Sequence, residues 1–226
     1  MNKKIVVFAP HPDDETLGCG GTIAKKLSEG YEVLIVILTD GRYAFLKMQG
    51  ISSDPTPEEL KEIRKEEVKR ATKILGISPQ NLLFLDFEDG SLEKNEEKVT
   101  KIITKIIKEN MPEEVYFPYE KDVHPDHRAT NRAVRSAIKQ LGLPIKKYQY
   151  SITQKFSRVG PIIDRILNLF KHNIIYVDIS EFFSRKEKAV KEFKSEIAVI
   201  SKKQKAPLMA DIRPFLKKEE MFYVDK

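Results

Sequence analysis

Two short motifs combine histidine with acidic residues, and these residues are the ones in the chain best suited to chemistry. His11-Pro12-Asp13-Asp14-Glu15 lies near the start, and His124-Pro125-Asp126-His127 lies past the middle. Together they contain three of the chain's four histidines. Catalytic zinc typically has three protein ligands from imidazole or carboxylate groups and keeps a fourth position for water. The two motifs can therefore build one hydrolytic metal site between them.

The first motif offers two neighbouring carboxylates. Because Pro12 fixes one backbone angle, we expect the side chains of Asp13 and Asp14 to point in different directions. One carboxylate can then bind the metal while the other takes a proton from metal-bound water, as metal-assisted hydrolysis requires. His11, Asp14 and His127 make a suitable set of two histidines and one carboxylate.

The second motif places His124 and His127 where a loop is expected to enter a helix. One imidazole can bind the metal while the other, oriented by a carboxylate such as that of Asp126, faces the reacting carbonyl. A protonated imidazole there can stabilise an oxyanion and protonate a leaving amine. The simpler alternative is that each motif is a turn and that Asp13 or Asp14 only caps a helix. Two motifs of this kind, each following an apolar run, disfavour that alternative.

The elements that must position these motifs alternate between strand and helix. Ligands bind beyond the carboxyl ends of parallel strands, and both motifs follow a predicted strand. Repeated strand–helix–strand units indicate a parallel sheet with helices on both faces. The predicted strands are 5–9, 32–38, 82–87 and 115–118, and the predicted helices are 16–29, 57–75, 93–110 and 127–141.

The pattern weakens after residue 143. Further strands are predicted at 146–153 and 174–179, a short helix at 161–170 and a long helix at 181–203, followed by a tail of mixed signals. No linker divides the chain, so residues 1–226 are expected to form a single domain. An irregular segment, 41–57, follows the second strand. Its Arg42 either binds a substrate hydroxyl or carboxylate, or is a solvated loop residue.

The composition limits the class of protein. The chain has 226 residues, of which 41% are hydrophobic and 33% charged, and its net charge of +6 is spread along the sequence. A mixed-charge surface is expected rather than a nucleic-acid-binding stripe. The single cysteine, Cys19, excludes an internal disulfide. We find no signal peptide and no apolar run of the ~18 residues that a membrane span needs. We therefore expect a cytoplasmic protein without a membrane segment.

The two motifs resemble the hallmark of the LmbE-like deacetylases, also called the PIG-L family. In that family an A-H-P-D-D-E stretch follows the first strand and H-P-D-H follows a later one, although Pro10 stands here where the family usually has Ala. Arg64-Lys65-Glu66-Glu67 resembles the family's R-x-E-E helix. The resemblance covers roughly residues 4–200 and weakens at Ser195-Glu196, where the family often has Ser-Gln.

This resemblance implies an α/β fold, a Rossmann-like three-layer sandwich with a mainly parallel central sheet, and often a homo-oligomer. It implies that His11, Asp14 and His127 bind Zn²⁺ and that Asp13 is the general base. The oxyanion would be stabilised by His124, with Asp126 as the partner of that imidazole, and Arg64 would contact substrate hydroxyls. Two histidines and a carboxylate also accept iron, cobalt or manganese.

Three functions are compatible with the sequence. The first is a zinc-dependent hydrolase that removes the N-acetyl group from an N-acetylglucosamine-containing small molecule, an amino sugar or a glycoconjugate. The second is an amidase of the same family acting on a thiol conjugate or another acylated amine. The third is a non-catalytic Rossmann-like binding module. The spacing of Gly18-Cys19-Gly20-Gly21 does not match a dinucleotide fingerprint, which disfavours the third.

Overall fold

A seven-stranded sheet forms the centre of the protein, in the order β3-β2-β1-β4-β5-β7-β6. The computed structural model describes residues 3–152 and 172–225, so the predicted helix 161–170 lies outside the described residues. Neighbouring strands from β3 to β5 are parallel, whereas β7 is antiparallel to both of its neighbours. The strands are β1 (Lys4–Ala9), β2 (Glu32–Thr39), β3 (Leu82–Phe87), β4 (Glu114–Pro118), β5 (Lys146–Tyr150), β6 (His172–Asp178) and β7 (Glu219–Asp225).

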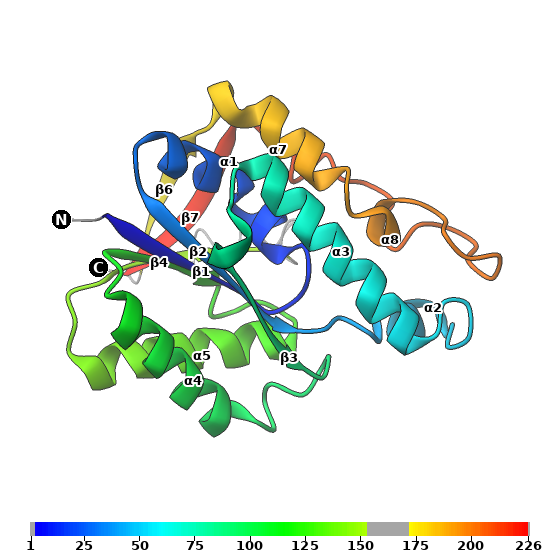
Figure 1. Ribbon diagram of the computed structural model, residues 1–226, viewed down its shortest axis with the longest axis horizontal. Coiled ribbons are helices and arrows are strands. Elements are labelled where there is room, and N and C mark those ends of the chain that lie inside the picture. The colour runs from blue at the N-terminus through cyan, green and yellow to red at the C-terminus, as the bar shows by residue number, and fades with distance from the viewer. Residues whose placement is uncertain (1–2, 153–171, 226) are drawn as a thin grey trace.

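Helices cover both faces of this sheet, as Figure 1 shows. One face carries α1, α3 and α7, and the other carries α4 and α5. Alternate residues of β1 enter the two cores: Val7 packs on the α1 side and Phe8 on the α4–α5 side. The predicted three-layer α/β architecture is therefore confirmed. The helices are α1 (Asp14–Ser28), α2 (Ala44–Gln49), α3 (Pro57–Leu75), α4 (Glu96–Asn110), α5 (Pro125–Leu141), α7 (Phe183–Val190) and α8 (Lys194–Ile197).

Burial on both faces explains the unbroken apolar runs of the inner strands. Local signals also set the helix ends. At the start of α3, Thr56 and Glu59 form a capping box and Pro57 occupies the first position. At its end, Gly76 adopts a left-handed conformation with φ of 102°, which a residue without Cβ adopts readily.

The prediction of one long helix over 181–203 is wrong. The chain instead forms a short 3-10 helix, Ser180–Phe182, then α7, and then α8 after a break at Phe193. The backbone N–H of Ser195 donates to the carboxylate of Glu67 on α3, which takes the place of a bond to the preceding helical turn. Docking onto α3 thus overrides the helical periodicity. The sequence also gave no indication of β7, which lies between β5 and β6.

The strand order creates a natural binding position. β1 lies between β2 and β4, so the connections that leave β1 and β4 turn away from each other at the carboxyl ends of these two strands. Ligands of open α/β sheets bind at such a switch point. The first motif follows β1 and the second follows β4, which brings two segments more than a hundred residues apart to the same edge.

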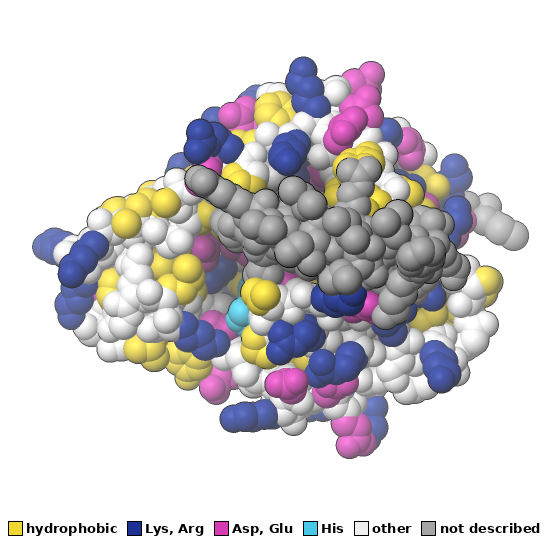
Figure 2. All heavy atoms as spheres, turned by 180° about the vertical axis from the view of Figure 1, so that it is seen from behind, with side chains coloured by type: hydrophobic (Ala, Val, Ile, Leu, Met, Phe, Trp, Pro, Cys, Tyr) yellow, Lys and Arg dark blue, Asp and Glu magenta, His cyan; other side chains and the backbone are white. Residues whose placement is uncertain are grey.

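Within residues 3–152 and 172–225, no helix combines the length and the apolar character needed to span a bilayer. Figure 2 shows one face of the molecule, on which lysines and arginines are interspersed with acidic residues and histidine atoms are visible at the surface.

Candidate metal centre

The loop after β1 bends sharply at Asp13, whose φ of 125° lies in a region that side-chain-bearing residues rarely adopt. Such a conformation costs about 1–3 kcal/mol and must be held by surrounding contacts. The carboxylate of Glu15 accepts the Asp13 N–H at 3.2 Å, and Arg64 donates to the Pro12 carbonyl at 2.7 Å. Asp13 occupies the N-cap position of α1, yet its side chain makes no capping bond. Simple helix capping therefore does not explain this residue.

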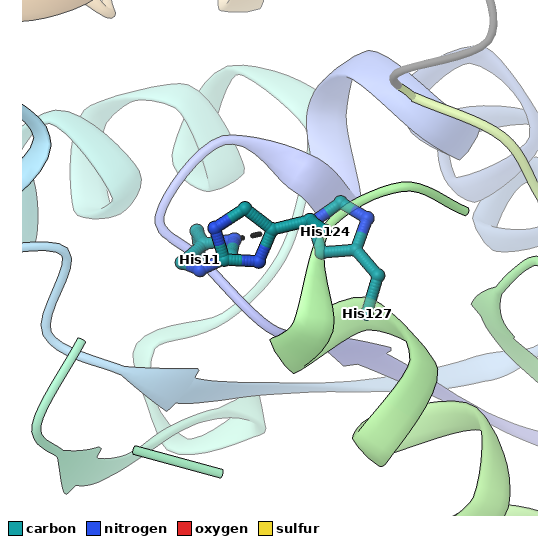
Figure 3. A group of neighbouring side chains, drawn as sticks. All are labelled: His11, His124 and His127. Atoms are coloured by element: carbon teal, nitrogen blue, oxygen red, sulfur yellow. Dashed lines mark hydrogen bonds between the residues drawn. The ribbon is translucent and has the colours of Figure 1, made fainter. Parts of the chain in front are cut away.

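The bend sends the two neighbouring carboxylates in different directions, as expected from Pro12. The Asp14 carboxylate lies 3.2 Å from Nδ1 of His11 and 3.2 Å from Nε2 of His127. Those two nitrogens are 3.1 Å apart. Figure 3 shows how His11 approaches from the loop after β1, while His124 and His127 approach from the start of α5. Three donor atoms from both motifs thus form a small, nearly equilateral triangle.

The size of this triangle fits a zinc ion. With Zn–N and Zn–O bonds of about 2.0–2.1 Å, tetrahedral geometry separates two ligands by about 3.3 Å. The donor set of His11, Asp14 and His127 meets this requirement without rearrangement. The ring nitrogens of His11, His124 and His127 also lie within 4.8 Å of one another, and so do one donor atom each of His11, Asp89 and Asp126. We favour the set of His11, Asp14 and His127, because its three edges of 3.1–3.2 Å match the separation expected between zinc ligands.

Two further carboxylates orient the imidazoles. The Asp126 carboxylate lies 3.3 Å from Nε2 of His11 and accepts the backbone N–H groups of Gly90 and Leu92. The Asp122 carboxylate lies 3.3 Å from Nδ1 of His127. Each imidazole thereby presents its other nitrogen to the triangle, the usual arrangement behind metal-binding histidines. Sequence reasoning missed Asp122, although it lies in the same loop, two residues before His124.

The same contacts control protonation in the metal-free protein. Burial disfavours charge on His11, but Asp126 and Asp14 outweigh it and raise the pKa of His11 to about 9. Burial likewise opposes charge on His127, and Asp14 and Asp122 raise its pKa to about 10. Burial acts against ionisation of Asp14, yet His127 and His11 hold its pKa well below the ordinary value. Protons thus occupy the triangle when no metal does.

His124 differs from the other two imidazoles. Its Nδ1 accepts the backbone N–H of Asp126, so a neutral ring carries its proton on Nε2. Burial, together with the charges of His11 and His127, lowers the pKa of His124 to about 4. The expected contact with Asp126 is therefore made through the backbone, whereas the Asp126 carboxylate faces His11. His124 lies beside the triangle, with its ring centre 4.5 Å from that of His11.

Asp13 contacts a buried arginine. One nitrogen of Arg64, Nη2, lies 3.3 Å from Oδ2 of Asp13 and 2.9 Å from Oε1 of Glu196. Arg64 is only 4% exposed. Burial raises the pKa of Asp13 well above its ordinary value, Arg64 opposes this rise, and Glu196 adds to it. The guanidinium that was expected to contact substrate hydroxyls is thus held by protein groups in this structure.

Two further cations of the described residues, Arg42 and Lys47, are also paired. Arg42 forms ion pairs with Asp40 at 2.7 Å and Glu58 at 2.5 Å, so it is neither a solvated loop residue nor free of protein partners. Lys47 on α2 contacts the Asp89 carboxylate at 2.9 Å. Asp89 is buried and lies 3.7 Å from Nε2 of His11. Sequence reasoning missed it, because no motif surrounds it.

A mainly parallel α/β sheet with a histidine–carboxylate triangle at its switch point is an α/β fold with a candidate metal centre where such folds bind their ligands. A family model described as GlcNAc-PI de-N-acetylase (PIG-L) matches residues 6–138. The chain belongs to this family and is an N-deacetylase, as its two motifs indicated.

Its relatives include a diacetylchitobiose deacetylase of Thermococcus kodakarensis, which is 33% identical over 86% of this chain and 70% of the relative. A probable N-acetyl-alpha-D-glucosaminyl L-malate deacetylase of Bacillus cereus is 35% identical over 77% of this chain and 80% of the relative. A deacetylase of teicoplanin biosynthesis shares the fold, with a TM-score of 0.74, 16% identity and coverage of 98% of this chain and 97% of that one. A teicoplanin deacetylase structure at TM-score 0.70, also 16% identical and with the same coverage, is of a zinc-inhibited form.

Proposed function

We propose that this protein is a zinc-dependent hydrolase that removes the N-acetyl group from an N-acetylglucosamine-containing small molecule. The observation that carries the proposal is the triangle of His11, Asp14 and His127, whose edges of 3.1–3.2 Å suit one tetrahedral ion. The names of the relatives support an acetylated amino sugar as the substrate class. A zinc ion held there would supply Lewis acidity and a water whose pKa is lowered toward about 7.

Asp13 is the proposed general base. It lies next to Asp14 in the chain but contributes none of the three atoms of the triangle, so its carboxylate is left for proton transfer. Burial favours its neutral form in the metal-free protein. Positive charge from Arg64 and from a bound divalent ion favours the carboxylate form that a base requires. Asp13 takes the proton of the attacking water and can return it to the leaving amine.

His124 is the proposed oxyanion donor. Because its Nδ1 accepts the Asp126 N–H, a neutral ring carries its proton on Nε2 and can donate a hydrogen bond from there. A donor fixed at a helix start costs little reorganisation when charge develops on the carbonyl oxygen. This assignment replaces the protonated imidazole considered from the sequence with a neutral one. The role of Asp126 becomes the positioning of His11 by its carboxylate and of His124 by its backbone N–H.

The test is a deacetylation screen with the metal content controlled. Purified protein is stripped with a chelator, reloaded with zinc, and assayed for acetate release from N-acetylglucosamine, its oligomers, and glycosides with acidic or lipid aglycones. We expect zinc-dependent acetate release from at least one amino sugar. Release of amine from acylated thiol conjugates alone would instead support the amidase alternative. Stoichiometric zinc without turnover of either class would contradict both functions.

A further inference from the structure

Glu196 lies outside the 6–138 stretch that matches the family model, yet it contacts the candidate site. It belongs to α8, which docks on α3 through two adjacent residues. Ser195 donates from its backbone N–H at 2.8 Å and from its hydroxyl at 2.6 Å to the carboxylate of Glu67. Glu196 pairs with Arg64 at 2.9 Å. Arg64 and Glu67 are three residues apart and share one face of α3.

These side chains are all buried. Glu67 is 1% exposed, Ser195 0% and Glu196 7%. Buried charges are costly unless they are paired, so the contacts fix the position of α8 against α3. They also place one carboxylate oxygen of Glu196 on the same guanidinium nitrogen that reaches Asp13.

Nη2 of Arg64 thus contacts three oxygen atoms. It donates to the Pro12 carbonyl at 2.7 Å and lies 3.3 Å from the Asp13 carboxylate and 2.9 Å from Glu196. The first two contacts hold the bend at which Asp13 has a positive φ. The third contact, together with the bond of Nη1 to the Gly41 carbonyl at 3.4 Å, restricts the rotation of the guanidinium. The long arginine side chain would otherwise sample several rotamers.

We propose that Glu196 is a positioning residue that acts through Arg64 on Asp13. By holding the guanidinium, it fixes both the strained backbone and the carboxylate of Asp13 in one geometry. The proposal rests on the role of Asp13 as the general base under the proposed function. A misplacement of about 1 Å at a reacting group can reduce the rate about 100-fold. Glu196 therefore affects the chemical step more than substrate binding.

Three substitutions separate geometry from charge. Glu196→Ala removes the contact, and Glu196→Asp keeps the charge but withdraws the oxygens by about one C–C bond, ~1.5 Å. Glu196→Gln keeps an acceptor oxygen of the same reach. Glu192→Ala is the matched control. Glu192 also pairs with an arginine of α3, but that arginine, Arg70, is exposed. Bound zinc, kcat and KM for acetate release are measured for each, with thermal melting as the check of folding.

We expect Glu196→Ala and Glu196→Asp to lower kcat by at least about tenfold with KM within about twofold and full zinc content. Glu196→Gln and Glu192→Ala should stay within about threefold of the unmodified protein. If Glu196→Ala does not fold, the contrast between Asp and Gln at this position decides. Unchanged kcat in Glu196→Asp and Glu196→Ala, an effect on KM alone, or equal impairment by Gln and Ala would overturn the proposal.

Failure of the proposed function gives a different result. In that case the unmodified, zinc-loaded protein shows no acetate release at all. Crystal structures of the unmodified protein and Glu196→Ala then provide the test. A shift of the Asp13 carboxylate by about 1 Å or more, with Arg64 displaced, supports the positioning role. An unmoved Asp13 overturns it.

Discussion

The carboxylate of Asp126 lies 3.3 Å from Nε2 of His11, so the second motif orients the imidazole of the first. The carboxylate itself is fixed by two backbone N–H groups, from Gly90 and Leu92. Because Nε2 faces this carboxylate, Nδ1 is the atom directed at Asp14 and His127. The metal triangle therefore depends on residues that do not belong to it.

The first prediction concerns these supporting carboxylates. Replacing Asp126 or Asp122 by Asn should weaken zinc binding about 10–100-fold, because each imidazole loses the charged acceptor that sets its orientation. Competition with a chromophoric chelator measures the affinity. Asp86→Asn is the control, since Asp86 is exposed and pairs only loosely with Lys65, at 3.6 Å. Unchanged affinity in both Asp122→Asn and Asp126→Asn would show that the imidazoles are oriented by other means.

The second prediction distinguishes the ligand set that contains Asp14 from the set of three histidines. If His11, Asp14 and His127 hold the ion, alanine at position 14 or 127 should reduce bound zinc from about one equivalent to near zero. Alanine at position 124 should leave zinc bound and lower kcat about 100- to 1000-fold, as expected for a lost oxyanion donor. Elemental analysis of the dialysed proteins distinguishes the cases. Loss of zinc from His124→Ala, with retention by Asp14→Ala, would establish the three-histidine set.

The third prediction is a pH dependence. In the metal-free protein the pKa of His11 is raised to about 9 and that of His127 to about 10. The ordinary pKa of histidine is about 6.5, so below about pH 6.5 the protonation of both residues contributes its full stabilisation of the metal-free fold. This contribution is lost as the pH rises toward 9–10. Zinc binds neutral imidazoles, so the stability of the zinc-loaded protein does not fall as these two histidines lose their protons.

Melting curves of stripped and zinc-loaded protein between pH 6 and 9 measure this difference. The increase in Tm caused by zinc should grow steadily with pH across this range. A zinc effect that is constant or that shrinks from pH 6 to 9 would mean that protons do not compete with the ion at these histidines.

The fourth prediction concerns stability away from the site. Lys186 and Glu220 form a buried pair at 2.5 Å, and Glu220 also accepts the N–H groups of Gly21 and Thr22. Lys186→Met leaves the carboxylate without its cation and should cost about 3–5 kcal/mol in the free energy of unfolding. Lys191→Met, which breaks the exposed pair with Glu187, should cost less than about 1 kcal/mol. Urea denaturation measures both free energies of unfolding. Equal losses in the two variants would refute the conclusion that the buried pair of Lys186 and Glu220 stabilises the fold more than an exposed pair.

The parallel half of the fold was predictable because its signals are local. Apolar runs marked β1 to β4, and Thr56, Pro57 and Gly76 marked the ends of α3. The later part was less predictable, since tertiary contacts decide it. Helix α7 ends at Val190, and Ser195 in the first turn of α8 gives its N–H to Glu67, although periodicity alone would continue one helix through both. The tail that forms β7 shows no distinctive pattern, yet it pairs with β5 and β6.

The site residues show the same contrast between local signals and tertiary contacts. The motifs identified the metal-binding and proton-transfer candidates because the residue types required by the chemistry are adjacent in the sequence. Asp122, Asp89 and Glu196 were not identified as site residues, because they reach the site only through folding. The contact between Asp126 and His124 that was expected from the motif is made by the backbone N–H of Asp126, whereas the fold directs its carboxylate at His11.

In the proposed mechanism Asp13 transfers the proton while a separate triangle holds the ion, and replacing Asp13 by Asn tests this division of roles. Acetate release by Asp13→Asn is compared with that of the unmodified protein, both carrying the same measured amount of zinc. We expect kcat to fall about 100- to 10,000-fold, as for loss of a general base, with zinc content unchanged. Undiminished turnover by fully zinc-loaded Asp13→Asn would contradict this division of roles.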